Sequence, residues 1–270
     1  MSNATINVFR LALALGCVLV PGLSAAESVA DKQSILRQAR RAYYDLRQHG
    51  LSTFRCDITP NWRMLLQQQL KDSPASTETA LKLLDQLRFK VTLAADDRVT
   101  LDHNDIPGQN KNTMDALKQI YGGMEQMTSG FFDTWKIFML APPLPDVDSD
   151  YDLQASGPFY RVTYKETDAD VDTTMTKDFA IANLSVTGRD FTSSIRPRFN
   201  RTGEGFVLAA YDASYRSGKP DEATELRIGA EYQSLNGLQM LRKLSIAGTY
   251  GGEAFPNIEL AFSGCRVTKK

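Results

Sequence analysis

Residues that commonly carry catalysis are scarce in this sequence. It has only two histidines, His49 and His103, and three cysteines among its 270 residues. It also lacks a Gly-x-Ser-x-Gly elbow, a phosphate-binding glycine loop and the His or Cys spacing of a zinc site. A histidine-based triad would therefore need one of these two histidines to meet a serine and a carboxylate that no motif marks. These absences predict a protein that is not an enzyme and needs no cofactor.

An excess of charge of either sign is absent too. The chain has 31 basic and 32 acidic residues and a formal net charge of -1. A balanced chain has no general attraction to nucleic acid or to anionic lipid, so we expect neither as a partner.

Metal-binding motifs are also missing. The acidic run that begins at Asp146 starts like a calcium loop, but Tyr151 stands where that loop needs glycine and Gly157 where it needs glutamate. A second acidic run, 168–172, alternates as a strand does and is most simply a solvated face, with weak cation binding as the alternative. We expect no metal site.

Long hydrophobic runs are missing as well. The run from Leu11 to Val20 has ten residues, well short of the ~20 that a membrane-spanning helix needs. Arg10 precedes it, Pro21-Gly22 ends it and small residues follow as far as Ala26, which is the pattern of a secretory signal peptide. We therefore expect cleavage near Ala26, removal of residues 1–26, and a periplasmic or secreted protein with no membrane span.

The three cysteines have different expected roles. Cys17 lies inside the apolar run and leaves a lipoprotein signal as an alternative, although the run continues past it to Val20. Cys56 and Cys265 lie in two stretches that alternate as strands do, near opposite ends of the mature chain. In an oxidising compartment they form a bridge if the first and last strands are neighbours, and otherwise they are two separately buried thiols. Either role is structural.

The spacing of apolar residues divides the chain into a mainly helical part and a part made of strands. The change falls at the run from Pro142 to Pro145. The later segments alternate as strands do, and the turns between them include Asn236-Gly237 and Gly251-Gly252, which favour two-residue hairpins. This order predicts one α+β domain over 27–270, a large curved antiparallel sheet or half-barrel with helices on its concave side. In the first part we expect helices over 31–48, 62–70, 76–87 and 112–140, a strand over 54–59 and a hairpin from 89–94 to 98–103.

The segment 112–140 carries most of the evidence about function. It holds four of the eight methionines and several large aromatic residues, and these side chains suit the wall of an irregular apolar cavity. Gly122, Gly123 and Gly130 weaken a helix, which suggests that close approach or movement matters there. The alternative is an ordinary core helix, since apolar stripes at this spacing usually pack. The residues expected to line a ligand cavity are Tyr121, Met124, Met127, Phe131, Trp135 and Phe138, with Trp62 as a further contributor.

The order of the elements is itself informative. A helix after the signal peptide is followed by a strand over 52–58, and the chain closes with strands around 231–233, 243–246 and 260–267. This order resembles the periplasmic lipoprotein-carrier superfamily. The resemblance implies an open half-barrel with a helical lid over an apolar cavity that receives acyl chains. It rests on element order and assigns no functional residue.

Three functions are therefore considered. The first is a non-enzymatic periplasmic carrier or binder of a lipid, a lipidated protein or another hydrophobic ligand. The second is a cell-envelope interaction or assembly protein with a packed core, a protein partner and no ligand. The third is a hydrolase with an unrecognised site, and if its catalysis depends on histidine, replacing His49 and His103 by alanine would abolish it.

Overall fold

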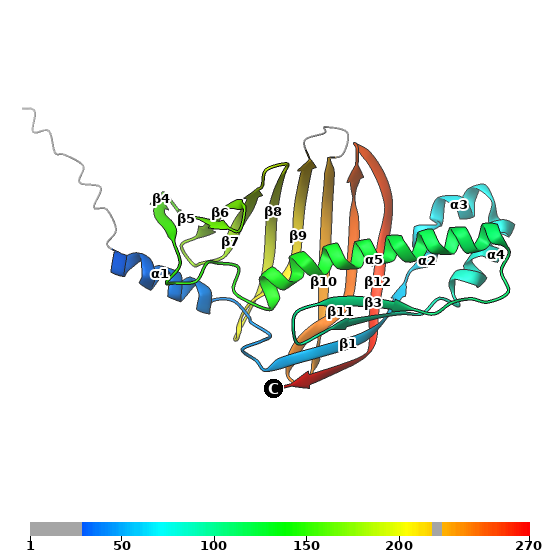
Figure 1. Cartoon of the computed structure of the whole chain (residues 1–270), viewed down its shortest axis with the longest axis horizontal. Helices are drawn as coiled ribbons and strands as arrows, with labels where there is room; N and C mark the ends of the chain where they lie inside the picture. Colours follow the sequence, from blue (N-terminus) through cyan, green and yellow to red (C-terminus); the bar gives the residue numbers. More distant parts are fainter. Residues whose placement is uncertain (1–28, 218–222) are drawn as a thin grey trace, which may run out of the picture.

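The computed structural model describes residues 29–217 and 223–270, so the expected signal peptide over 1–26 lies outside the described residues. Within these ranges the chain forms five helices and twelve strands (Figure 1). The helices are α1 (Val29–Arg41), α2 (Trp62–Leu65), α3 (Gln67–Asp72), α4 (Pro74–Leu84) and α5 (Lys111–Met139). The strands before α5 are β1 (Leu51–Pro60), β2 (Phe89–Leu93) and β3 (Val99–His103). Those after it are β4 (Tyr151–Ser156), β5 (Phe159–Glu166), β6 (Ala169–Thr176), β7 (Ile181–Thr187), β8 (Phe191–Thr202), β9 (Gly205–Ser217), β10 (Thr224–Leu235), β11 (Leu238–Tyr250) and β12 (Glu253–Lys269).

All of these strands belong to one antiparallel sheet. Its order is β3-β2-β1-β12-β11-β10-β9-β8-β7-β6-β5-β4, and because the two outermost strands do not pair with each other, the sheet is not closed. Neighbours from β4 to β12 are consecutive in the sequence, while the β1–β3 group adds to the free side of β12. The expected α+β class and the large antiparallel sheet are confirmed.

The first strand and the last strand are neighbours in the sheet, and their pairing brings two cysteines together. The pairing of β1 with β12 shifts between Arg55 and Asp57, where β12 has one extra residue in a bulge. Gly264 lies in this bulge with a φ of 56°, a conformation that glycine adopts without strain. Cys56 and Cys265 meet beside it and form a disulfide between residues 209 apart in the sequence. Of the two roles that the sequence left open for them, the structure contains the bridge.

Several elements agree with the sequence pattern. The turn between β10 and β11 is formed by Asn236 and Gly237, whose φ angles of 53° and 77° are those that a two-residue type I′ hairpin requires. The expected hairpin from 89–94 to 98–103 is β2 paired with β3. The expected long helix is α5, which begins after Asn110, whose side chain accepts a hydrogen bond from the Thr113 N–H.

The helix expected over 76–87 forms as α4 and ends at Leu84, and two other expected helices differ more strongly from the sequence pattern. The helix expected over 31–48 ends at Arg41, because the next residues bond to the sheet: Tyr43 forms a parallel bridge with Phe206, whose N–H donates to the Ala42 carbonyl at 2.8 Å. The helix expected over 62–70 is interrupted at Leu66 and forms the short helices α2 and α3. After Arg41, hydrogen bonds to a strand distant in the sequence replace those of the local helix.

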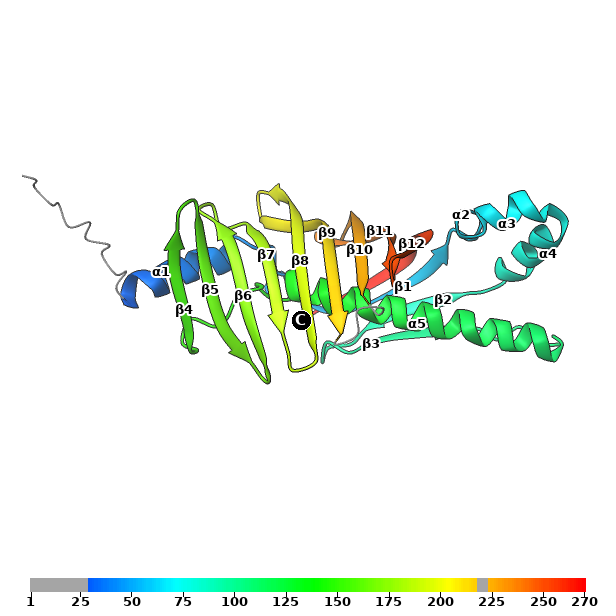
Figure 2. The ribbon, with the colours of Figure 1, turned by 90° about the horizontal axis from the view of Figure 1, so that it is seen from above.

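Helix α5 lies across one face of the sheet and runs crosswise to strands β8 to β12 (Figures 1 and 2). The ring of Phe132 packs against Phe262 of β12, with 6.4 Å between ring centroids, and the Trp135 indole N–H donates to the Tyr232 hydroxyl of β10 at 3.2 Å. Phe138 packs against Phe199 of β8, with ring centroids 5.9 Å apart. Phe132, Trp135 and Phe138 are fully buried, and burial of such side chains contributes about 1.5–3 kcal/mol each.

Helix α1 lies at the other end of the sheet, beside β4 to β7 (Figure 1). Its Lys32 forms an ion pair of 2.8 Å with Asp152 of β4, and its Arg40 donates to the Leu144 and Pro145 carbonyls at 2.5 and 2.7 Å. These contacts tie the helix to the segment that connects α5 to the sheet. Among the described residues, no helix has both the length and the apolar character needed to cross a membrane.

Candidate functional site

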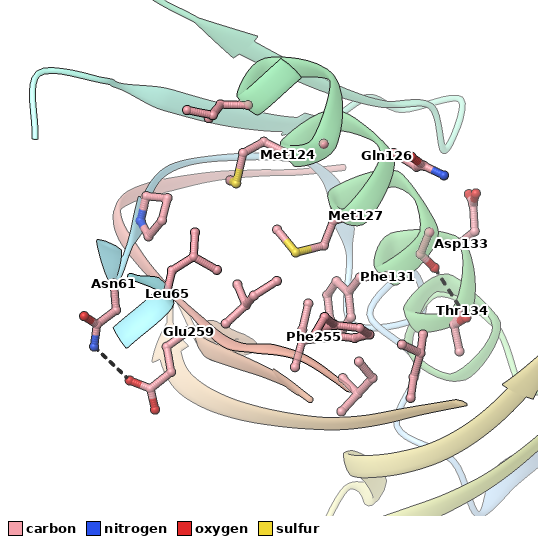
Figure 3. Close-up of a pocket in the computed structure, with 18 of the residues that line it drawn as sticks. Asn61, Leu65, Met124, Gln126, Met127, Phe131, Asp133, Thr134, Phe255 and Glu259 are labelled. Atoms are coloured by element: carbon pink, nitrogen blue, oxygen red, sulfur yellow. Dashed lines mark hydrogen bonds between the residues drawn. The ribbon is translucent and has the colours of Figure 1, made fainter. Parts of the chain in front are cut away.

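A cavity of about 690 Å³ lies between α5 and the sheet (Figure 3). This volume falls in the range of ~300–1,000 Å³ that is typical of small-molecule sites. Its wall is formed by the end of β1, by α2, by one flank of α5 and by the facing sides of β9 to β12. Most of the lining side chains are aliphatic or aromatic, so the interior suits an apolar ligand.

Only one flank of α5 faces this cavity. Met124, Met127 and Phe131 line it together with Gly123 and Gly130. These residues recur at intervals of three or four, so they share one side of the helix. Figure 3 shows the two methionine side chains and the phenyl ring directed into the cavity.

The seven residues expected to line a cavity are divided by the structure. Trp62, Met124, Met127 and Phe131 line it, whereas Tyr121, Trp135 and Phe138 are not among the lining residues. Trp135 and Phe138 face the sheet from the neighbouring side of α5 and belong to the packed core. The expectation that all seven residues line one cavity is therefore too broad, because the apolar side of α5 includes residues that pack on the sheet as well as residues that line the cavity.

Tyr121 has a different environment. Its ring stacks on the imidazole of His103 with centroids 3.7 Å apart, and its hydroxyl donates to the Asn104 carbonyl at 3.2 Å. The other histidine, His49, stacks on Tyr44 at 4.5 Å. Both histidines thus lie against tyrosine rings outside the cavity.

The glycines of α5 do not mark a close approach of another chain segment. A Cβ atom added to Gly122, Gly123 or Gly130 would meet no heavy atom within 4 Å. Gly123 and Gly130 lie at the exposed margin of the cavity, whereas Gly122 does not line it. Of the expected close approach or movement, the close approach is therefore wrong.

Sequence reasoning did not find the part of the wall that the sheet supplies. These residues alternate as ordinary strand residues do, and alternation shows which residues share a face but not what covers that face. The lining residues of the sheet are Tyr211, Tyr215, Leu226, Ile228, Ile246, Phe255, Ile258 and Glu259.

Three hydroxyl-bearing residues gather on the β9 side of the cavity. The Thr134 hydroxyl donates to the Gly130 carbonyl at 3.4 Å and lies 3.4 Å from the Tyr215 hydroxyl. Tyr211, four residues before Tyr215, lies on the same face of β9 and is 2 % exposed. Burial raises the pKa of Tyr211, so this phenol stays neutral at all ordinary pH values.

On the side of the cavity near α2, the lining includes the carboxylate of Glu259. Glu259 of β12 forms an ion pair of 2.6 Å with Lys243 of β11, and its other oxygen accepts a hydrogen bond from the Asn61 side chain at 3.4 Å. The Asn61 N–H also donates to the Glu259 carbonyl at 2.8 Å, which fixes the start of α2 against the sheet. The hydrogen bond from Lys243 lowers the pKa of the Glu259 carboxyl.

A second hollow, of about 430 Å³, is polar and lies over strands β8 to β11. Asp212, which lines it, accepts hydrogen bonds from Arg198 at 2.5 Å and Arg227 at 3.4 Å. The Arg198 hydrogen bond is the main reason that the pKa of Asp212 is lowered. Solvent-exposed ion pairs of this kind contribute little to the stability of the fold. In the described ranges no group of three or more His, Cys, Asp or Glu side chains is placed to hold a metal ion.

Comparison of the chain with models of protein families, with curated proteins and with solved structures gives no match. The site is therefore interpreted from its own geometry.

Proposed function

We propose that this chain is a non-enzymatic binding or carrier protein for a hydrophobic ligand such as a lipid or a lipidated protein, acting in the periplasm or outside the cell. The observation that carries the proposal is the apolar cavity of about 690 Å³ between α5 and the sheet. Each methylene of a ligand that is buried there would contribute about 0.8 kcal/mol to binding. The signal-peptide pattern of residues 1–26 supports the location.

The proposal includes the shape of the site. The sheet curves as a half-barrel, and α5 covers its concave side as a lid over the cavity. The crosswise position of α5 and the open sheet support this arrangement (Figures 1 and 2). It also agrees with the resemblance in element order to the periplasmic lipoprotein-carrier superfamily, in which acyl chains occupy such a space.

The alternative function, an envelope assembly protein with a packed core, requires the space under α5 to be filled. The space of about 690 Å³ bounded by Met124, Met127 and Phe131 is open on one side and lined mainly by apolar side chains. A concave apolar hollow of this size is typical of a ligand site. The cavity therefore favours a protein that holds a ligand, and a protein partner in the envelope is compatible with this role.

The first experiment asks whether the native protein carries a ligand. The mature chain is purified from its native envelope, and an organic extract is examined by mass spectrometry beside a control that was unfolded and refolded. A stoichiometric acyl-chain species in the first sample alone supports the proposal. An empty extract, together with no uptake of the apolar fluorophore phenylnaphthylamine by the refolded chain, contradicts it.

A pair of charge substitutions on α5 locates the ligand. Met127 lines the cavity, whereas Met114 is 47 % exposed on the same helix and does not line it. We expect Met127→Glu to abolish uptake, because a carboxylate in an apolar site is costly, and Met114→Glu to leave it unchanged. Circular dichroism is used to check that both variants keep the sheet. Equal uptake by the two variants would show that this flank of α5 is not part of the ligand site.

A further inference from the structure

The charges around the cavity restrict the ligand further. None of the lining residues, all of them within the described part of the chain, is a lysine, an arginine or a histidine. The lining acids are Glu259, paired with Lys243 at 2.6 Å, and Asp133, paired with Lys136 at 2.9 Å. A ligand carboxylate or phosphate would therefore find no lining cation to pair with.

The two acids also lie at the margin of the cavity. Asp133 has a side chain that is 65 % exposed, and Figure 3 shows it and Gln126 directed away from the interior. Glu259 lies beside Asn61 on the α2 side, where both are held by hydrogen bonds to each other. The space between these margins offers a ligand mainly apolar atoms and the hydroxyl cluster.

The hydroxyl cluster of Thr134, Tyr211 and Tyr215 is suited to a neutral polar group. The contacts of the Thr134 hydroxyl with the Gly130 carbonyl and the Tyr215 hydroxyl are each 3.4 Å long, whereas O–H···O hydrogen bonds are usually ~2.7–2.8 Å, and Thr134 is also hydrogen-bonded to Tyr211. Because the two measured contacts are long, the Thr134 and Tyr215 hydroxyls can bond more closely to a ligand atom. A hydroxyl both donates and accepts, so it matches an alcohol, an ester or an amide.

We propose that the cavity binds an uncharged amphiphile, with its apolar chain along Met124, Met127 and Phe131 and its hydroxyl, ester or amide group at the Thr134–Tyr211–Tyr215 cluster. This inference rests on the proposed function and names the chemical class of its ligand. An unpaired anion is disfavoured by the cost of burying its charge among apolar groups with no lining cation. A cation would have to displace Lys243 from Glu259.

The test uses the full mature chain and three amphiphiles with the same chain. Dodecanol, dodecanoate and dodecylamine are each titrated against bound phenylnaphthylamine at neutral pH. At this pH their head groups are neutral, negative and positive, respectively. We expect dodecanol to displace the fluorophore at a concentration at least about tenfold lower than the other two. A stronger effect of dodecanoate or dodecylamine, or equal effects of all three, would overturn the inference.

Two isosteric variants test the hydroxyl cluster. Tyr215→Phe and Thr134→Val each remove one hydroxyl, and we expect each to weaken dodecanol binding about five- to tenfold. Tyr250→Phe is the matched control, because Tyr250 is 58 % exposed and does not line the cavity. Unchanged dodecanol binding in both variants contradicts the inference and leaves the proposed function standing. If phenylnaphthylamine does not bind the unaltered chain at all, the proposed function itself fails.

Discussion

The glycines of α5 allow the stability of the helix and the volume of the cavity to be changed separately. Gly122 and Gly130 both have open space where a Cβ would lie, but only Gly130 lines the cavity. Alanine is favoured over glycine in a helix interior by about 0.8–1.0 kcal/mol. We therefore expect Gly122→Ala and Gly130→Ala each to raise the free energy of unfolding by about 1 kcal/mol, which is about 2–4 °C in Tm for a chain of this size.

Leucine at the same positions separates the two sites. Because Gly130 lines the cavity and Gly122 does not, we expect the isobutyl group of Gly130→Leu to reduce the space for a ligand and that of Gly122→Leu to leave it unchanged. If the isobutyl group of Gly130→Leu displaces two methylenes of a bound chain, the loss is about 1.6 kcal/mol, slightly more than tenfold in Kd. Gly122→Leu should bind as the unaltered chain does.

Two assays decide the outcome. Urea unfolding followed by tryptophan fluorescence gives the stability of each variant, and displacement of phenylnaphthylamine by dodecanol gives the affinity. A loss of stability in Gly130→Ala would refute the open space beside this residue. Equal affinities of the folded Gly122→Leu and Gly130→Leu variants would refute the assignment of the cavity as the binding site.

Three further predictions concern other parts of the molecule. Replacing Cys56 and Cys265 by serine opens a loop of 209 residues and should lower the free energy of unfolding by about 5 kcal/mol in urea titrations, and a loss below about 1 kcal/mol would contradict a stabilising bridge. The chain has two tryptophans, of which Trp62 lines the cavity and Trp135 does not. A bromine-bearing alkane should therefore quench the fluorescence of the Trp135→Phe variant, which retains Trp62, and not that of Trp62→Phe. The reverse would contradict the cavity assignment. The pKa of Glu259 is lowered by its lysine partner, so the ion pair stabilises the fold above the ordinary glutamate range of ~4.3 and this contribution is lost as the pH falls through the lowered value. The difference in stability between the unaltered chain and Glu259→Gln should therefore be present at neutral pH and vanish at low pH, and a difference that does not change with pH would contradict the assignment.

Much of the fold could be predicted because local signals agree with the final structure. The Asn236-Gly237 turn has the backbone angles that its residues favour, and α5 has both a strong periodicity and an N-cap at Asn110. The exception is the segment after Arg41, where helical spacing continues but the chain leaves the helix. Tyr43 bonds there to β9, some 160 residues further along the chain, and a local pattern contains no information on such a partner.

The candidate site was only partly predictable, for a reason that lies in α5. The side that packs on the sheet, with Trp135 and Phe138, and the flank that lines the cavity, with Met127 and Phe131, are both apolar. Periodicity identifies an apolar side chain and its direction on the helix, but a packed sheet and an empty space both select apolar residues. The apolar stripe alone therefore could not separate the two.

Two glycines of α5 lie on the flank that lines the cavity. Gly123 and Gly130 are two helical turns apart and lie on either side of Met127 along the cavity flank, and each has open space beside it. In a packed seam, a missing side chain would leave a void that costs stability, and a larger residue would fill it. Glycine on an apolar flank of a long helix, at a cost of about 1 kcal/mol relative to alanine, is instead consistent with a space that is kept open. Gly122 does not line the cavity but weakens the helix by the same amount. Variants of Gly122 therefore report on helix propensity alone, and variants of Gly130 report on helix propensity and cavity volume together.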